Sequence, residues 1–159
     1  MSLSNFTDTI NGVDYSGKGL QKYVTTDGDK TLATILDASF SQVGSWVKDS
    51  STNEESFVVK LPDSSTSGYK EEGYYKADTN DAGFSWVYNY DSSNAFTGGS
   101  ETVNNVTSTL DASWQVTAAS VDTSKLTTLS GQSDIDLLPN SLVLTNATTS
   151  AEYALYNVK

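Results

Sequence analysis

The residues best suited to contact a ligand lie in a short aromatic segment in the middle of the chain. Phe84, Trp86, Tyr88 and Tyr90 follow one another at intervals of two positions. Alternate side chains of a strand point to the same face, so the four rings are expected to form one row. Such a row can form the core of a β-sandwich, bury itself against another subunit, or stack on sugar rings. The sequence favours these three roles in that order.

Carboxylates are the other groups that could do chemistry, because two of them suffice for glycoside hydrolysis. The chain has six glutamates, four of them in the adjacent pairs Glu54-Glu55 and Glu71-Glu72. Adjacent strand residues point to opposite faces, so neither pair can flank a single sugar bond by itself. We therefore expect solvated charges rather than a catalytic pair. A carboxylate-dependent glycoside hydrolase is the third of three function classes considered.

Calcium is the metal that this composition could bind, since it takes oxygen ligands and needs neither histidine nor cysteine. Asp78, Asn80 and Asp81 are spaced like the start of a calcium loop. The pattern then fails, because Ala82 stands at a ligand position and Asn89 replaces the closing glutamate. Two further carboxylate pairs are Asp27 with Asp29 and Asp134 with Asp136. We expect all of these residues to cap turns, with Asp78, Asn80 and Asp81 as the calcium candidates and no other cofactor.

Three residue types on which enzymes and nucleic-acid readers rely are missing. The chain has no histidine, no cysteine and no arginine, and its formal net charge is -11 with lysine as the only cation. The side chains that usually perform acid/base catalysis near pH 7, thiolate chemistry and bidentate phosphate binding are therefore absent. The acidic balance repels nucleic acids and anionic membranes, and no run approaches the ~20 apolar residues of a membrane span. We expect no enzyme, no nucleic-acid partner and no membrane partner.

Short apolar or aromatic runs recur at the spacing of strands, and turn residues separate them. The runs are Leu20–Thr25, Ser56–Leu61, Tyr69–Ala77, Gly83–Tyr90, Leu110–Val121, Ser141–Thr145 and Ala151–Val158. The turn signals are Asp27-Gly28, Pro62–Ser65, Asn80–Gly83, Gly98-Gly99 and Gly131-Gln132. This pattern predicts a mainly β fold, either a β-sandwich or a jelly roll.

The segment 30–47 admits two interpretations. Its apolar residues, from Leu32 to Val47, follow a helical stripe, which predicts one amphipathic helix. However, Leu36–Val43 is echoed by Leu110–Val116, and the second copy alternates like a strand. If the echo is a true duplication, with halves near 20–93 and 94–159, the first copy is a strand as well.

The domain organisation follows from these patterns. Residues 1–19 are polar and glycine-bearing and are expected to form an extended arm that docks on assembly, and residues 20–159 a single β-rich domain. We expect a non-enzymatic structural subunit that contacts itself and other structural subunits as a homo-oligomer, most simply a bacteriophage virion component such as a capsid decoration or tail protein. The alternative is a carbohydrate-binding or adhesin module, extracellular or at the cell surface.

Overall fold

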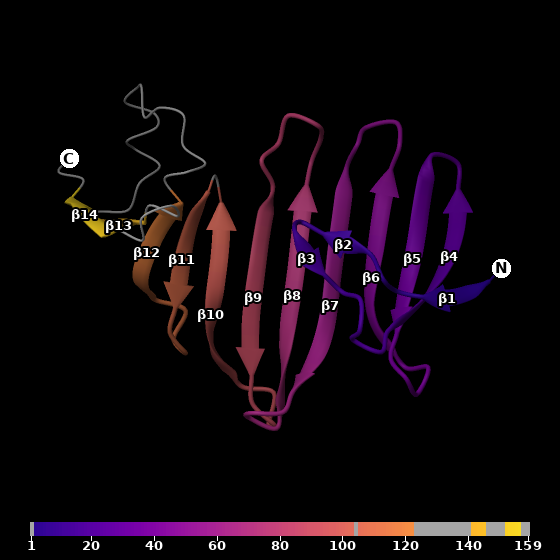
Figure 1. The fold of residues 1–159 in the computed structure, drawn as a ribbon, viewed down its shortest axis with the longest axis horizontal. Coiled ribbons are helices and arrows are strands. Elements are labelled where there is room, and N and C mark those ends of the chain that lie inside the picture. Colours follow the sequence, from indigo (N-terminus) through magenta and orange to yellow (C-terminus); the bar gives the residue numbers. More distant parts are fainter. Residues whose placement is uncertain (1, 104, 123–140, 146–151, 157–159) are drawn as a thin grey trace.

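The computed structural model describes residues 2–103, 105–122, 141–145 and 152–156 (Figure 1). Its elements are β1 (Leu3–Asn5), β2 (Thr9–Ile10), β3 (Val13–Asp14), β4 (Gln21–Asp27), β5 (Lys30–Leu36), β6 (Gln42–Asp49), β7 (Glu55–Asp63), β8 (Gly68–Lys76), β9 (Phe84–Tyr90), β10 (Phe96–Val103), β11 (Val106–Leu110), β12 (Val116–Asp122), β13 (Ser141–Thr145) and β14 (Glu152–Tyr156). Within these ranges there is no helix, and so none that could span a membrane.

One large sheet makes up most of the described fold. Its order is β1 followed by β4 through β14, and the ten strands β1 and β4 to β12 are antiparallel to their neighbours. Strand β13 then pairs in parallel with β12. The sheet is not closed into a barrel, and the hairpin β2–β3 is separate from it. The mainly β prediction is confirmed, but the described residues form a single sheet with a hairpin instead of the two packed sheets of a sandwich or jelly roll.

The helix predicted over 30–47 is wrong. This segment forms β5, a turn and β6, and Ala33 and Ile35 alternate into the core as strand residues do. The helical stripe arose because two strands of about seven residues, joined by a turn, place apolar residues at mixed spacings of three and four. The turn signal Gly98-Gly99 is also wrong, since both residues lie in β10, where Gly98 forms part of a bulge.

The echo between 36–43 and 110–116 marks a recurring turn. The segments 37–41, 91–95 and 111–115 connect β5–β6, β9–β10 and β11–β12 at the same end of the sheet (Figure 1). In each, the backbone N–H of the first residue, an aspartate, donates to the carbonyl of the fifth residue. The aspartate Oδ1 accepts from the backbone N–H of the third and fifth residues at 2.8 and 3.0 Å. The single strand predicted over 110–121 is therefore broken at this turn.

The fourth residue of each of these turns has a left-handed backbone. It is Asn94 in one turn, with φ 64°, but Phe40 and Trp114 in the others, with φ 61° and 63°. Asparagine adopts this conformation readily, whereas large side chains rarely do. Two of the three turns thus hold an aromatic residue in a conformation that disfavours it.

The core lies between the N-terminal segment and one face of the sheet. The hairpin β2–β3 crosses that face in front of β6 to β8 (Figure 1). Ring contacts join the two layers, with centroids 5.2 Å apart for Tyr15 and Phe57 and 6.3 Å for Phe6 and Phe57. The buried cluster consists of Phe6, Ile10, Tyr15, Leu20, Ile35, Phe57 and Val59. Residues 2–19 therefore pack on their own sheet and complete its core.

Replacing the strained turn residue Phe40 should stabilise the protein. The side chain is 62% exposed, so Phe40→Asn loses little burial while it relieves the left-handed strain. We expect the free energy of unfolding, measured by urea titration, to rise by about 1 kcal/mol. The matched control Asn94→Phe places an aromatic at the same turn position and should lower it by a similar amount. Equal stabilities for all three proteins would contradict this account.

Candidate functional site

The predicted aromatic row lies on the face of the sheet opposite the hairpin. In the register of the sheet, Phe57 of the core lies opposite Tyr74, and Trp86 lies opposite Gly73. Because Gly73 and Tyr74 are adjacent in β8, they face opposite sides of the sheet, so Trp86 and its row lie on the face away from the core. Phe84, Trp86, Tyr88 and Tyr90 do share that face, and each is half-buried. They belong to no part of the buried cluster, and the only other described sheet, the hairpin, lies on the far side.

Neighbouring strands and one turn extend this row. Tyr69 of β8 stacks on Tyr90 with ring centroids 4.8 Å apart, and Phe96 of β10 lies 5.8 Å from Tyr90. Trp114, in the turn between β11 and β12, stacks on Phe96 at 3.6 Å. We call the seven residues together the aromatic face: Tyr69, Phe84, Trp86, Tyr88, Tyr90, Phe96 and Trp114.

A glycine fixes the position of the central indole. A Cβ on Gly73 would lie 1.9–2.5 Å from three atoms of the Trp86 six-membered ring. The indole therefore lies across the backbone of β8, in the space that any other side chain at position 73 would fill. One surface of the ring rests on the strand, and the other points away from it.

Glutamates hold the polar ends of the aromatic side chains. On the aromatic face, Trp86 Nε1 donates to Glu71 at 3.1 Å and Tyr88 OH donates to Glu101 at 2.5 Å. Three further glutamates accept in the same way: Glu55 from Trp46 and Glu72 from Tyr15 on the other face, and Glu54 from Tyr75, which pairs with Phe84. Glu71 and Glu72 thus lie on opposite faces, as strand alternation requires. Each of these carboxylates accepts a hydrogen bond from an aromatic side chain.

Burial and carboxylates also change the acidity of the tyrosines. Burial, followed by the hydrogen bond to Glu101, raises the pKa of Tyr88 well above its usual range. The pKa of Tyr15 is raised in the same direction, first by burial and then by the hydrogen bond to Glu72. Both phenols are therefore held as neutral donors, and neither is prepared to act as a base.

The calcium candidates lie in the turn between β8 and β9 and cap its backbone. Asp78 accepts from the N–H groups of Asn80 and Asp81, and Asp81 accepts from those of Ala77 and Gly83. These backbone hydrogen bonds, Ala77 first, lower the pKa of Asp81. Among the described residues, no group of three or more acidic side chains could hold a metal ion. The carboxylates at 134 and 136 lie outside the described residues.

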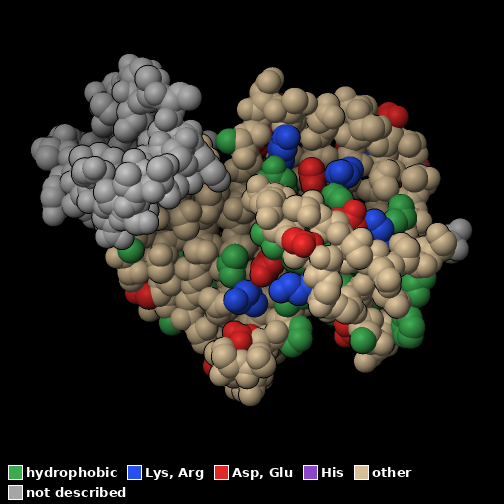
Figure 2. Space-filling model, viewed as in Figure 1, with side chains coloured by type: hydrophobic (Ala, Val, Ile, Leu, Met, Phe, Trp, Pro, Cys, Tyr) green, Lys and Arg blue, Asp and Glu red, His purple; other side chains and the backbone are tan. Residues whose placement is uncertain are grey.

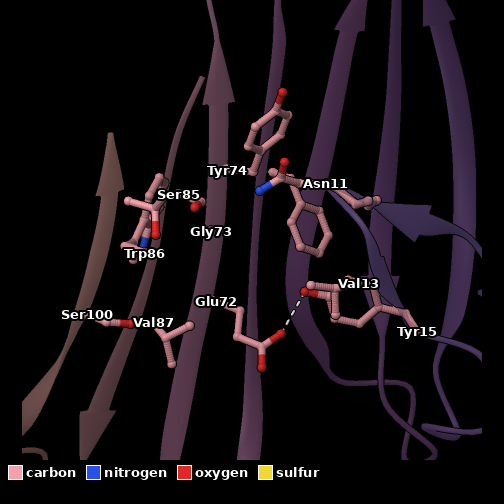
Figure 3. Close-up of a pocket in the computed structure, with 13 residues that line it drawn as sticks. Asn11, Val13, Tyr15, Glu72, Gly73, Tyr74, Ser85, Trp86, Val87 and Ser100 are labelled. Carbon is pink, nitrogen blue, oxygen red and sulfur yellow. Dashed lines mark hydrogen bonds between the residues drawn. The ribbon is translucent and has the colours of Figure 1, made fainter. Parts of the chain in front are cut away.

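The opposite face offers a small cavity beside the hairpin (Figure 3). It has a volume of about 140 Å³, below the usual size of small-molecule pockets, and Val13, Tyr74 and Val87 are among its lining residues. The one carboxylate among its lining residues, Glu72, accepts a hydrogen bond from Tyr15 OH at 2.6 Å. Charged side chains of both signs are scattered over this face (Figure 2). The aromatic face is the stronger candidate site.

Three members of the aromatic face lie outside the predicted row of four. Tyr69 lies in a predicted strand, but its place beside Tyr90 depends on the register of β8 and β9. Phe96 comes just before a bulge in β10, which puts it opposite Tyr90 on this face. Trp114 was expected in a strand interior. The repeated Asp-Ala-Ser sequence before Phe40 and Trp114 was the signal that could have located the turn.

The comparisons with known proteins give no further identification. No protein-family model, no curated protein and no solved structure matches this chain.

Stability should fall at high pH because of the protected tyrosines. Unfolded tyrosines lose their protons near pH 10, whereas Tyr15 and Tyr88 keep theirs to higher pH in the folded state. The stabilisation of the folded state that comes from these raised pKa values is fully present below pH 10 and is lost as the pH rises above it. Urea midpoints measured from pH 8 to 11 should decline above pH 10, less steeply in Tyr15→Phe. Parallel curves for the two proteins would show that Tyr15 contributes nothing.

Proposed function

We propose that this chain is a non-enzymatic carbohydrate-binding module of the adhesin type, which works outside the cell or at a surface and binds through its aromatic face. The observation that carries this proposal is an aromatic row left outside the core, with carboxylate acceptors set among its rings. The aromatic face has both kinds of group that sugar recognition needs, and the proposal requires no histidine, cysteine or metal.

The chemistry of a sugar fits both parts of the face. A pyranose has an apolar surface of C–H groups, which stacks on the negative face of an aromatic ring. The Trp86 indole is half-buried, so part of its ring is accessible for this contact. Glu71 and Glu101 each accept one aromatic hydrogen bond, and a carboxylate has further lone pairs for sugar hydroxyl donors.

Charge argues for an uncharged ligand. If two copies packed with their aromatic faces together, Glu71 and Glu101 of each copy would be buried. Burying a charge costs several kcal/mol per ion unless the charge is paired. Among the described residues, Lys60 lies beside the aromatic face, with Nζ 5.2 Å from the centroid of Tyr69. One lysine cannot balance two carboxylates, and acidic glycans would meet a chain of net charge -11.

A structural subunit, such as the virion component expected from the sequence, is the second candidate. The observation in its favour is the incomplete edge of β4. Strand β1 pairs only with Gln21–Tyr23, and no described strand pairs with the outer edge of Val24–Asp27. A strand from another copy could extend the sheet there by backbone hydrogen bonds.

The carbohydrate proposal is tested on an array of neutral and acidic oligosaccharides. We expect wild-type protein to be retained by neutral glycans and by no uronate-containing glycan. Trp86→Ala removes the central stacking surface and should weaken binding at least tenfold in a calorimetric titration. Phe40→Ala is the matched control, because Phe40 is an exposed aromatic residue outside the face, and it should bind like wild type. No retention on any glycan would remove this function.

The subunit proposal is tested by light scattering over a range of protein concentrations. Association through the open edge should give species larger than a monomer, and Val24→Lys should reduce them, since an edge lysine opposes strand pairing. A monomer at every concentration would rule out assembly through this edge.

A further inference from the structure

The aromatic face contains rings in two orientations. The ring planes of Phe84 and Trp86 make an angle of 26°, and those of Trp86 and Tyr88 make an angle of 30°. Because Trp86 lies across the backbone of Gly73, these three rings form a surface that follows the sheet. We call them the aromatic floor.

The other orientation is nearly perpendicular to this floor. Phe96 and Trp114 are parallel within 7° and stack at 3.6 Å. Their planes make angles of 84° and 77° with the ring of Tyr88, at centroid distances of 5.8 and 5.1 Å. We call this stacked pair the aromatic wall. The floor and the wall meet at Tyr88 at nearly a right angle, and we call this junction the corner.

The wall depends on a strained residue. Trp114 has φ 63° and is 49% exposed, although Asn94 occupies the same turn position elsewhere without strain. The backbone hydrogen bonds of the two turns are alike, so the turn itself does not need an aromatic residue. Phe40 carries the same strain in its own turn, so strain alone does not mark a site. What distinguishes Trp114 is that its ring stacks on Phe96 at 3.6 Å and so extends the aromatic face.

We propose that the corner between floor and wall is the subsite that holds one sugar ring of a neutral glycan, and that Trp114 determines its specificity. This inference rests on the proposed function. The floor stacks on one surface of the sugar, while the exposed surface of the Trp114 indole contacts its side. Glu101, hydrogen-bonded to Tyr88 at the corner, accepts a hydroxyl donor. The corner limits which ring substituents fit, which a flat platform cannot do.

The occupant follows from the charges around the corner. Tyr88 is held neutral by burial and by Glu101, so the nearest formal charge is a carboxylate. A uronate or sulfated sugar would place like charges together, whereas a neutral ring supplies only hydroxyl donors. A second copy of this chain would bring its own Glu71 and Glu101 to the same place.

The test compares three substitutions by isothermal titration calorimetry. The probes are cellotetraose, mannotetraose and tetra-N-acetylchitotetraose, each tested against wild type, Trp114→Asn, Trp114→Tyr and Phe40→Asn. Asparagine keeps the left-handed turn, as at position 94, but removes the wall, while tyrosine keeps a ring there. For whichever probe wild type binds, we expect Trp114→Asn to weaken binding at least tenfold and Trp114→Tyr by less than about threefold. Phe40→Asn, which makes the same change in another turn, should leave binding unchanged.

The outcomes separate this inference from the function on which it rests. Urea titration first shows that each variant is folded, so that weaker binding reports on the site. If Trp86→Ala abolishes binding and Trp114→Asn has wild-type affinity, the aromatic face binds the glycan but the corner is not a subsite. Equal loss for Trp114→Asn and Phe40→Asn would also overturn it. If wild type binds none of the probes and nothing on the array, the carbohydrate function fails as a whole.

Discussion

The described structure depends on one constraint: a single sheet has two faces, and the hairpin β2–β3 covers only one of them. On the covered face, Phe57 and the N-terminal residues Phe6 and Tyr15 form a closed core. On the other face the large rings must stay partly in water. They do so by contacting one another and by donating their polar hydrogens to glutamates, as Trp86 and Tyr88 do.

This arrangement explains the unusual composition. A chain without arginine or histidine has few cationic partners for its glutamates, and lysine supplies all nine cations. Indole N–H and phenol O–H groups take that place, because they are neutral donors whose rings can also be half-buried. The described ion pair between Lys22 and Asp8, at 2.7 Å, lies instead beside the N-terminal segment.

Local patterns allowed part of the fold and site to be predicted from the sequence. Strict alternation placed Phe84 to Tyr90 on one face, and turn residues located β4, β7, β8 and β9. The layer arrangement could not be predicted, because alternation tells which residues share a face but not what covers it. The error at 30–47 has the same origin, since two strands joined by a five-residue turn imitate a helical stripe. Trp114 joins the face only through a bulged register and a left-handed turn, which no short sequence window encodes.

The meander from β4 to β12 has a further consequence. Strands β5 to β12 each pair only with the strand before and the strand after in the chain, and β4 pairs with β1 and β5. Strands that are neighbours in the chain are thus neighbours in the sheet, as in repeat arrays whose stability is approximately a sum over adjacent units. Evolution can therefore lengthen or shorten it by whole hairpins without disturbing distant pairings, and the number of aromatic strands displayed becomes a variable that gene duplication can adjust.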